Sequence, residues 1–152
     1  MKNYKLTFEC VPEPCWRDSL AQRLPRELWD KIRKDAYARA GYKCSICGAK
    51  GRLEAHEKWS YDEQNAVQKL ETVIALCNAC HSVKHISRTY LVGRGAEAET
   101  HFRQVNNCSQ MEYHAELAKM NEEYLRRNRI ENWTTDFSWL INYGKEKESK
   151  EK

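Results

Sequence analysis

The sequence lacks any run of about 18 apolar residues, which is the length that an α-helix needs to cross a lipid bilayer. Its first residues, MKNYKLTFECVPEP, also lack the apolar segment of a secretory signal peptide. No internal repeat is visible. We therefore expect a cytoplasmic protein with no membrane partner, and in that compartment its thiols would be reduced.

The composition is that of a folded domain with a polar surface. Of the 152 residues, 41% are hydrophobic and 32% are charged, which argues against an intrinsically disordered chain. The length suits one domain with a modest core. The 26 lysines and arginines exceed the 22 acidic residues, so the net charge is +4. Basic residues crowd the segment 23–58 and gather again within 126–129, which permits nucleic-acid binding but equally suits solvated helix faces.

Four of the seven cysteines form two C-x2-C pairs. The pairs are Cys44 with Cys47 and Cys77 with Cys80. Two such pairs are typical of a tetrahedral four-cysteine zinc site, which needs no water ligand and serves folding. A redox role for a single pair is the alternative, and the matching second pair argues against it. Cys10 and Cys15 have no histidine nearby and are expected to be buried or free thiols.

Hydrophobic spacing predicts a mixed α and β chain. Alternation over 52–61 predicts a strand, and the turn residues at 62–65 lead to a returning strand at 67–70 and a short apolar run at 73–76. Helices are expected over 25–41, 78–91, 96–105 and 109–130.

These elements suggest a division of the chain into four parts. We expect an N-terminal arm at 1–24, a core domain with its leading helix at 25–92, a helical extension at 93–143 and a disordered charged tail at 144–152. The arm should pack through Leu6, Phe8 and Trp16, and an aromatic cluster within 133–140 should fasten the C-terminus to the body.

Three histidines accompany the cysteine pairs. His81 and His85 are four residues apart, so on one helix they share a face. The hairpin would bring His56 alongside them. Taken alone, His81 could be a fifth zinc ligand or a cap, and His85 is better explained as an exposed helix residue. Together with His56 they form a plausible site for a divalent cation and a general base. His101 and His114 are expected to be surface or packing residues.

The order CSICG, LEAHEKW and LETVIALCNACHSVKH resembles the HNH endonuclease family, the ββα-metal nucleases, in its zinc-stapled form. The resemblance covers about residues 41–90. It implies an α+β fold with a ββα-metal core and a structural Zn²⁺ on the four cysteines. The flanking segments resemble those around HNH domains in phage and bacterial proteins.

The same resemblance implies a role for each histidine. His56 matches the general base, and His81 and His85 match the positions that hold the catalytic cation, which would be Mg²⁺, Mn²⁺, Ni²⁺ or Zn²⁺. The partner would be a nucleic acid, double-stranded DNA in this case. Contacts to its phosphates are expected from Lys58, Lys84 and Arg88.

Two positions depart from the family pattern. Ala55 stands where a metal-binding Asp or His is usual, and Thr72 replaces the middle Asn. Thr72 can still brace a loop through a hydrogen bond, whereas Ala55 cannot bind a metal. Glu57 is the expected substitute ligand, with Glu54 and Asp62 behind it.

Two classes of function follow from these residues. The first is a metal-dependent endonuclease that hydrolyses DNA phosphodiester bonds with His56 as general base. The alternative is a non-catalytic zinc module that binds nucleic acid or another protein. A third possibility is that the helical part after residue 96 docks onto a larger assembly, with the zinc unit as an adaptor.

Overall fold

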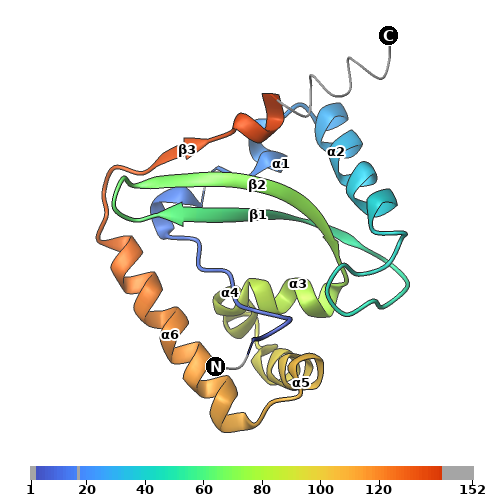
Figure 1. Ribbon diagram of the computed structural model, residues 1–152, viewed down its shortest axis with the longest axis vertical. Coiled ribbons are helices and arrows are strands. Elements are labelled where there is room, and N and C mark those ends of the chain that lie inside the picture. The colour runs from blue at the N-terminus through green and yellow to red at the C-terminus, as the bar shows by residue number, and fades with distance from the viewer. Residues whose placement is uncertain (1–2, 17, 142–152) are drawn as a thin grey trace.

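The computed structural model describes residues 3–16 and 18–141, and it is a mixed α and β fold with a three-stranded sheet (Figure 1). The expected disordered tail lies outside the described residues. No helix within the described ranges is long and apolar enough to span a bilayer. In chain order the elements are η1 Glu13–Cys15, α1 Leu20–Arg23, α2 Arg26–Arg39, β1 Glu54–Asp62, β2 Val67–Leu76, α3 Asn78–Lys84, α4 Ile86–Leu91, α5 Gly95–Asn106, α6 Gln110–Asn128 and β3 Thr134–Asp136.

The sheet has the strand order β1-β2-β3. Strands β1 and β2 form an antiparallel hairpin, in which Glu54 pairs with Leu76 at the open end. The register shifts between Lys58 and Trp59, as in a β-bulge. Strand β3 then adds to β2 in parallel. The predicted hairpin is confirmed, but β2 is one continuous strand where we expected two short segments.

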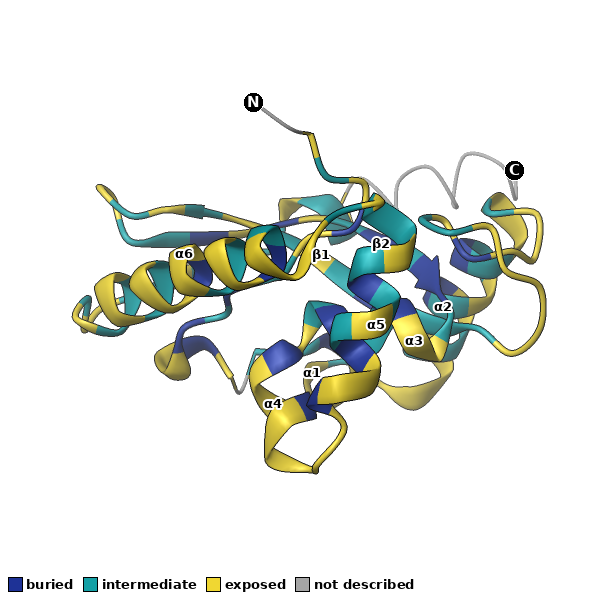
Figure 2. Ribbon diagram, turned by 90° about the horizontal axis from the view of Figure 1, so that it is seen from below, coloured by how far each residue is buried: buried dark blue, intermediate teal, exposed yellow. Residues whose placement is uncertain are grey.

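Two hydrophobic cores lie on opposite faces of the hairpin. Adjacent residues of β2 show the division, because Ile74 packs against the first core while Val73 belongs to the second. The second core lies under α1 and α2. The buried residues of the first core are Leu6, Cys10, Cys44, Leu76, Cys80, Val83, Ile86, Ala98, Phe102, Tyr113 and Met120. Helix α6 buries only Tyr113 and Met120 and leaves most of its surface exposed (Figure 2).

The predicted single helix over 78–91 is wrong, because it breaks at His85. The backbone there has φ −102° and ψ 53°, which ends α3 and starts α4. The hydroxyl of Thr89 donates to the carbonyls of Ser82 (2.6 Å) and His85 (3.0 Å), so a side chain stabilises the break. The helix axis therefore changes direction at a candidate site residue.

The two ends of the chain meet the body differently from each other. Leu6 and Phe8 pack on the first core as expected. Trp16 is instead 56% exposed, stacks beside Tyr124 and donates its indole N–H to the carbonyl of Val11 (3.0 Å). At the other end the expected aromatic cluster is present. Phe137 packs edge-on against Trp59, with the ring centroids 6.0 Å apart.

The start of α5 provides a test of the packing. A Cβ built on Gly95 would lie 2.2 Å from ring carbons of Tyr90. That ring is held by a 2.8 Å hydrogen bond between the hydroxyls of Tyr90 and Tyr113, and Tyr113 is fully buried. We expect Gly95→Ala to lower the free energy of unfolding by about 1–3 kcal/mol, the usual cost of overpacking, as measured by urea denaturation.

The matched control is the double variant Gly95→Ala with Tyr90→Ala. Removal of the ring removes the clash, so the double variant should lose less stability than the sum of the single variants. Additive losses would show that the ring is not the cause.

Candidate metal centres

The four cysteines of the two C-x2-C pairs come together at the open end of the hairpin. Their sulfur atoms all lie within 4.8 Å of one another, and Cys47 Sγ is 3.7 Å from Cys77 Sγ. A tetrahedral zinc with bonds of about 2.3 Å separates its sulfurs by about 3.8 Å. The cluster therefore has the dimensions of a metal site, as the sequence predicts, and it could hold a structural ion.

Local backbone bonds shape both halves of this cluster. Gly48 has φ +76° and donates its N–H to the carbonyl of Cys44 (3.0 Å), which closes the first knuckle. The N–H of Ser45 donates to Ala75 on β2 (2.9 Å) and ties that knuckle to the sheet. In the second knuckle, Cys77 caps α3 and its sulfur accepts the N–H of Cys80 (3.4 Å).

Electrostatics in the cluster favour a bound cation. Burial, together with the negative charges of the neighbouring thiolates, raises the pKa of Cys80. Burial also opposes ionisation of Cys44, but hydrogen bonds from backbone N–H groups outweigh it and lower its pKa to about 7. Four thiolates this close are stable together only when a positive ion neutralises them. His101 of α5 places Nε2 3.1 Å from Cys80 Sγ, a packing contact that no sequence pattern indicates.

His56, His81 and His85 form a second cluster. One ring nitrogen from each lies within 4.8 Å of the others, and the ring centroids are 4.9–5.2 Å apart. His56 comes from β1, His81 from α3 and His85 from the junction of α3 and α4. His56 is buried, His81 is partly buried and His85 is exposed, so the cluster opens to solvent at His85.

The surroundings of His81 and His85 favour neutral rings, in which one nitrogen keeps a free lone pair. Desolvation lowers the pKa of His81, although the hydrogen bond to Glu54 opposes the shift. Desolvation and the two neighbouring imidazoles lower the pKa of His85 to about 4. Glu54 Oε1 lies 2.8 Å from Nδ1 of His81, so this carboxylate accepts the Nδ1 proton and leaves Nε2 as the basic nitrogen.

Glu57, the expected substitute for a ligand at Ala55, does not join this cluster. Residues 55 and 57 face the second core, because side chains alternate along a strand and His56 faces the other way. The Glu57 carboxylate instead accepts the N–H of Leu20 (3.0 Å), and burial raises its pKa. Of the other acids considered, Glu54 contacts His81, whereas Asp62 accepts hydrogen bonds from Asn65 in the hairpin turn.

Glu9 is a site residue that the sequence analysis missed. Its carboxylate contacts His56 Nε2 through Oε2 and accepts the N–H of Trp59 through Oε1 at 3.3 Å. The side chains of Glu9 and His56 are only 9% and 3% exposed. The alternation of apolar and polar residues over 6–10 is the one signal that could have pointed to it.

The three expected phosphate-binding residues have different surroundings. Lys58 and Arg88 are exposed, while Lys84 is partly buried and donates to the hydroxyl of Thr7 (2.9 Å). Burial lowers the pKa of Lys84. Lys58 and Arg88 are therefore the two whose charges face solvent.

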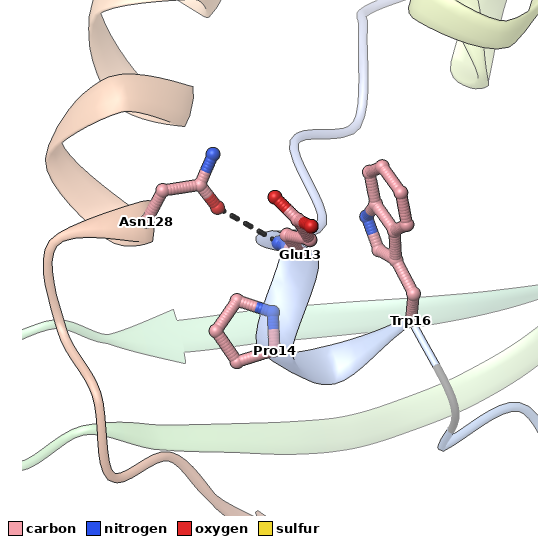
Figure 3. Close-up of a pocket in the computed structure, with 4 residues that line it drawn as sticks. All are labelled: Glu13, Pro14, Trp16 and Asn128. Carbon is pink, nitrogen blue, oxygen red and sulfur yellow. Dashed lines mark hydrogen bonds between the residues drawn. The ribbon is translucent and has the colours of Figure 1, made fainter.

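A hollow elsewhere on the surface is lined by residues in and next to η1 and by the end of α6. It has a volume of about 480 Å³ and is lined by Glu13, Pro14, Trp16 and Asn128 (Figure 3). Asn128 accepts the N–H of Glu13 there (2.8 Å), which ties η1 to the end of α6. No cysteine or histidine among the described residues lines this hollow. The four-cysteine cluster and the histidine cluster therefore remain the candidate functional sites.

Comparisons of the chain with models of protein families, with curated proteins and with solved structures find no match. The function is therefore argued from the two clusters and their surroundings.

Loss of one thiol tests the cysteine centre. Cys77→Ser should lose bound zinc and unfold more easily, because an ion bound only by the folded state stabilises it by at least about 2.7 kcal/mol at a hundredfold excess over Kd. Cys108→Ser is the control, since Cys108 lies outside the cluster. Zinc content by elemental analysis and thermal unfolding measure both effects, and a Cys77→Ser protein with full zinc would contradict the assignment.

The burial of the Glu57 carboxylate can be tested through the pH dependence of stability. Its pKa is raised in the folded state, so ionisation costs stability at pH values above the unfolded pKa. Glu57→Gln keeps an acceptor for Leu20 without a charge. It should therefore be more stable than the wild type at pH 7.5, with a smaller advantage at pH 5, as followed by urea denaturation.

The same variant separates the two faces of β1. Metal binding at the histidine cluster should be unchanged in Glu57→Gln, because the carboxylate contacts Leu20 on the other face. A large loss of metal affinity would restore Glu57 as a ligand.

Proposed function

We propose that this protein is a metal-dependent endonuclease of the HNH type that hydrolyses phosphodiester bonds in DNA. The observation that carries the proposal is the meeting of His56, His81 and His85 within 4.8 Å, between a strand and a helix joined by the cysteine centre. Such a cluster combines a buried imidazole with two others that lead to solvent. It offers both a base and cation ligands at one accessible point.

In this proposal each histidine has its own task. His56 takes a proton from the attacking water as the water oxygen bonds to phosphorus, and the bond from phosphorus to the 3′-oxygen breaks. His81 and His85 would hold a divalent cation, which supplies positive charge for the phosphate and the leaving oxygen. His85 is exposed as a residue, but its ring packs against those of His56 and His81, and desolvation by this packing lowers the pKa of His81 and of His85. Neutral imidazole is therefore favoured near pH 7 at both residues.

The cysteine centre and the exposed basic residues have different tasks in this proposal. The cysteine centre fixes the start of α3 beside the end of β2, so its role is structural. Lys58 and Arg88 lie exposed on β1 and α4, and we propose that they contact phosphates of double-stranded DNA. Phosphate contacts position a duplex without reading its sequence, and binding of this kind weakens as salt is added.

One observation favours the alternative of a non-catalytic zinc module. Ala55 offers no ligand, and Glu57 turns to the other face of the strand. A site without that ligand could retain nucleic-acid binding and lack hydrolysis. The two functions differ in whether any metal supports cleavage.

A nicking assay on supercoiled plasmid decides between them. With Mg²⁺, Mn²⁺, Ni²⁺ or Zn²⁺ present, we expect the wild type to nick the plasmid and His56→Ala to be at least about 100-fold slower, the usual contribution of a general base. His114→Ala is the control, since His114 is exposed on α6 and outside the cluster.

The outcomes are distinct provided that zinc content and circular dichroism show each variant to be folded. Nicking that survives in His56→Ala would contradict the assigned base. A wild type that cuts with none of the metals but binds DNA in a salt-dependent way would be the non-catalytic module.

A further inference from the structure

The N-terminal arm presents alternate residues to two different environments. Leu6, Phe8 and Cys10 pack on the first core, where Phe8 stacks on Phe102 with the ring centroids 5.0 Å apart. Between them, Thr7 accepts a hydrogen bond from Lys84, and Glu9 contacts the histidine cluster. The arm thus carries one polar edge along α3 and β1.

The arm is fixed on both sides of Glu9. Leu6 exchanges two hydrogen bonds with the side chain of Asn106, its N–H donating to Oδ1 (2.9 Å) and its carbonyl accepting from Nδ2 (2.8 Å). Cys10 is held by Arg127, which donates to its carbonyl (2.7 Å). The N–H of Glu9 itself donates to the carbonyl of Lys84 (3.1 Å). Glu9 therefore lies on a segment with its backbone restrained at three points.

Both carboxylate oxygens of Glu9 already have hydrogen-bond partners. Oε2 meets His56 Nε2, and Oε1 meets the N–H of Trp59, where the strand register shifts. Glu9 is also outside the group of ligand atoms that lie within 4.8 Å of one another. These facts argue against direct metal ligation by Glu9 and favour a role exerted through His56.

We propose that Glu9 is the positioning residue of the histidine site. An ionised carboxylate can only accept a hydrogen bond, so it keeps a proton on Nε2 of His56 and leaves Nδ1 as the nitrogen with a free lone pair. It also stabilises the imidazolium that forms when His56 takes a proton. This inference rests on the proposed function, in which His56 is the general base.

The arm thereby supplies the carboxylate that contacts His56, whereas Glu57, on the same strand as His56, turns to the other face. Glu9 is 47 residues from His56 in the sequence, and position 55 next to His56 is an alanine. The acid at Glu9 does not replace the ligand missing at Ala55. It gives the base a fixed tautomer and ring orientation.

The test is nuclear magnetic resonance of the histidine rings in the full chain, with zinc in the cysteine centre and no added metal. In the wild type, the ¹⁵N shifts should place the His56 proton on Nε2, and that proton should be protected from exchange with solvent. In Glu9→Ala, we expect it to exchange at least about tenfold faster. In Glu9→Gln, one amide oxygen must serve both donors, so the exchange rate should lie between those of the wild type and Glu9→Ala. Loss of the signal in His56→Ala assigns it.

Glu13→Ala is the matched control, because Glu13 lies on the same arm, is exposed and contacts neither His56 nor Trp59 through its side chain in the described structure. It should leave the His56 signal unchanged. A proton on Nδ1 in the wild type, or equal protection in Glu9→Ala, would overturn the inference.

A metal titration separates positioning from ligation. The affinity of the histidine cluster for Co²⁺ should fall less than about 100-fold in Glu9→Gln. This is the range for groups that orient the residues of a metal site without binding the metal themselves. A larger loss would make Glu9 a ligand and overturn the proposed role. If the wild type nicks no plasmid, the proposed function fails, whereas the ring signals still decide whether Glu9 orients His56.

Discussion

The closure of four thiols into one cluster is the constraint on which the rest of the structure depends. Cys44 and Cys80 are buried in the first core, while their partners Cys47 and Cys77 are 3.7 Å apart at its edge. An ion bound there would join the segment before β1 to the segment after β2 and would hold the hairpin and α3 in one relative position. Cys77 caps α3, the helix that carries His81, so the cysteine cluster lies at the start of the helix that faces His56 on β1.

The histidine cluster combines one residue of strand β1 with two residues of the helical segment that follows the hairpin. Strand alternation turns His56 toward the helices and Glu57 away from them. The break after Lys84 then places His85 at the opening of the cluster. The N–H of His85 still donates to the carbonyl of His81 (3.2 Å), so the two histidines remain one helical turn apart despite the break. His56 is the buried member on the strand, and His85 is the exposed member where α3 ends, at a break that the hydroxyl of Thr89 stabilises.

The flanking segments do more than surround this centre. The N-terminal arm brings Glu9 to His56, and α5 brings His101 to Cys80. Helix α6 holds the arm through Arg127, which also pairs with Glu63 at the hairpin turn (3.3 Å) and lies over the ring of Tyr61. Each candidate metal centre therefore has a neighbour from a distant part of the chain, as expected where outer contacts orient ligands or bases.

The cysteine cluster, the hairpin and the histidine cluster could be predicted from the sequence, because spacing within short segments encodes each of them. The C-x2-C pairs, the alternation along β1 and the i, i+4 histidines need no knowledge of distant residues. Three features became visible only in the folded chain: Glu57 faces the second core, α3 ends at His85, and Glu9 contacts His56. Those outcomes depend on which face of the hairpin is covered by which segment, and no local pattern records a contact between residues 47 positions apart.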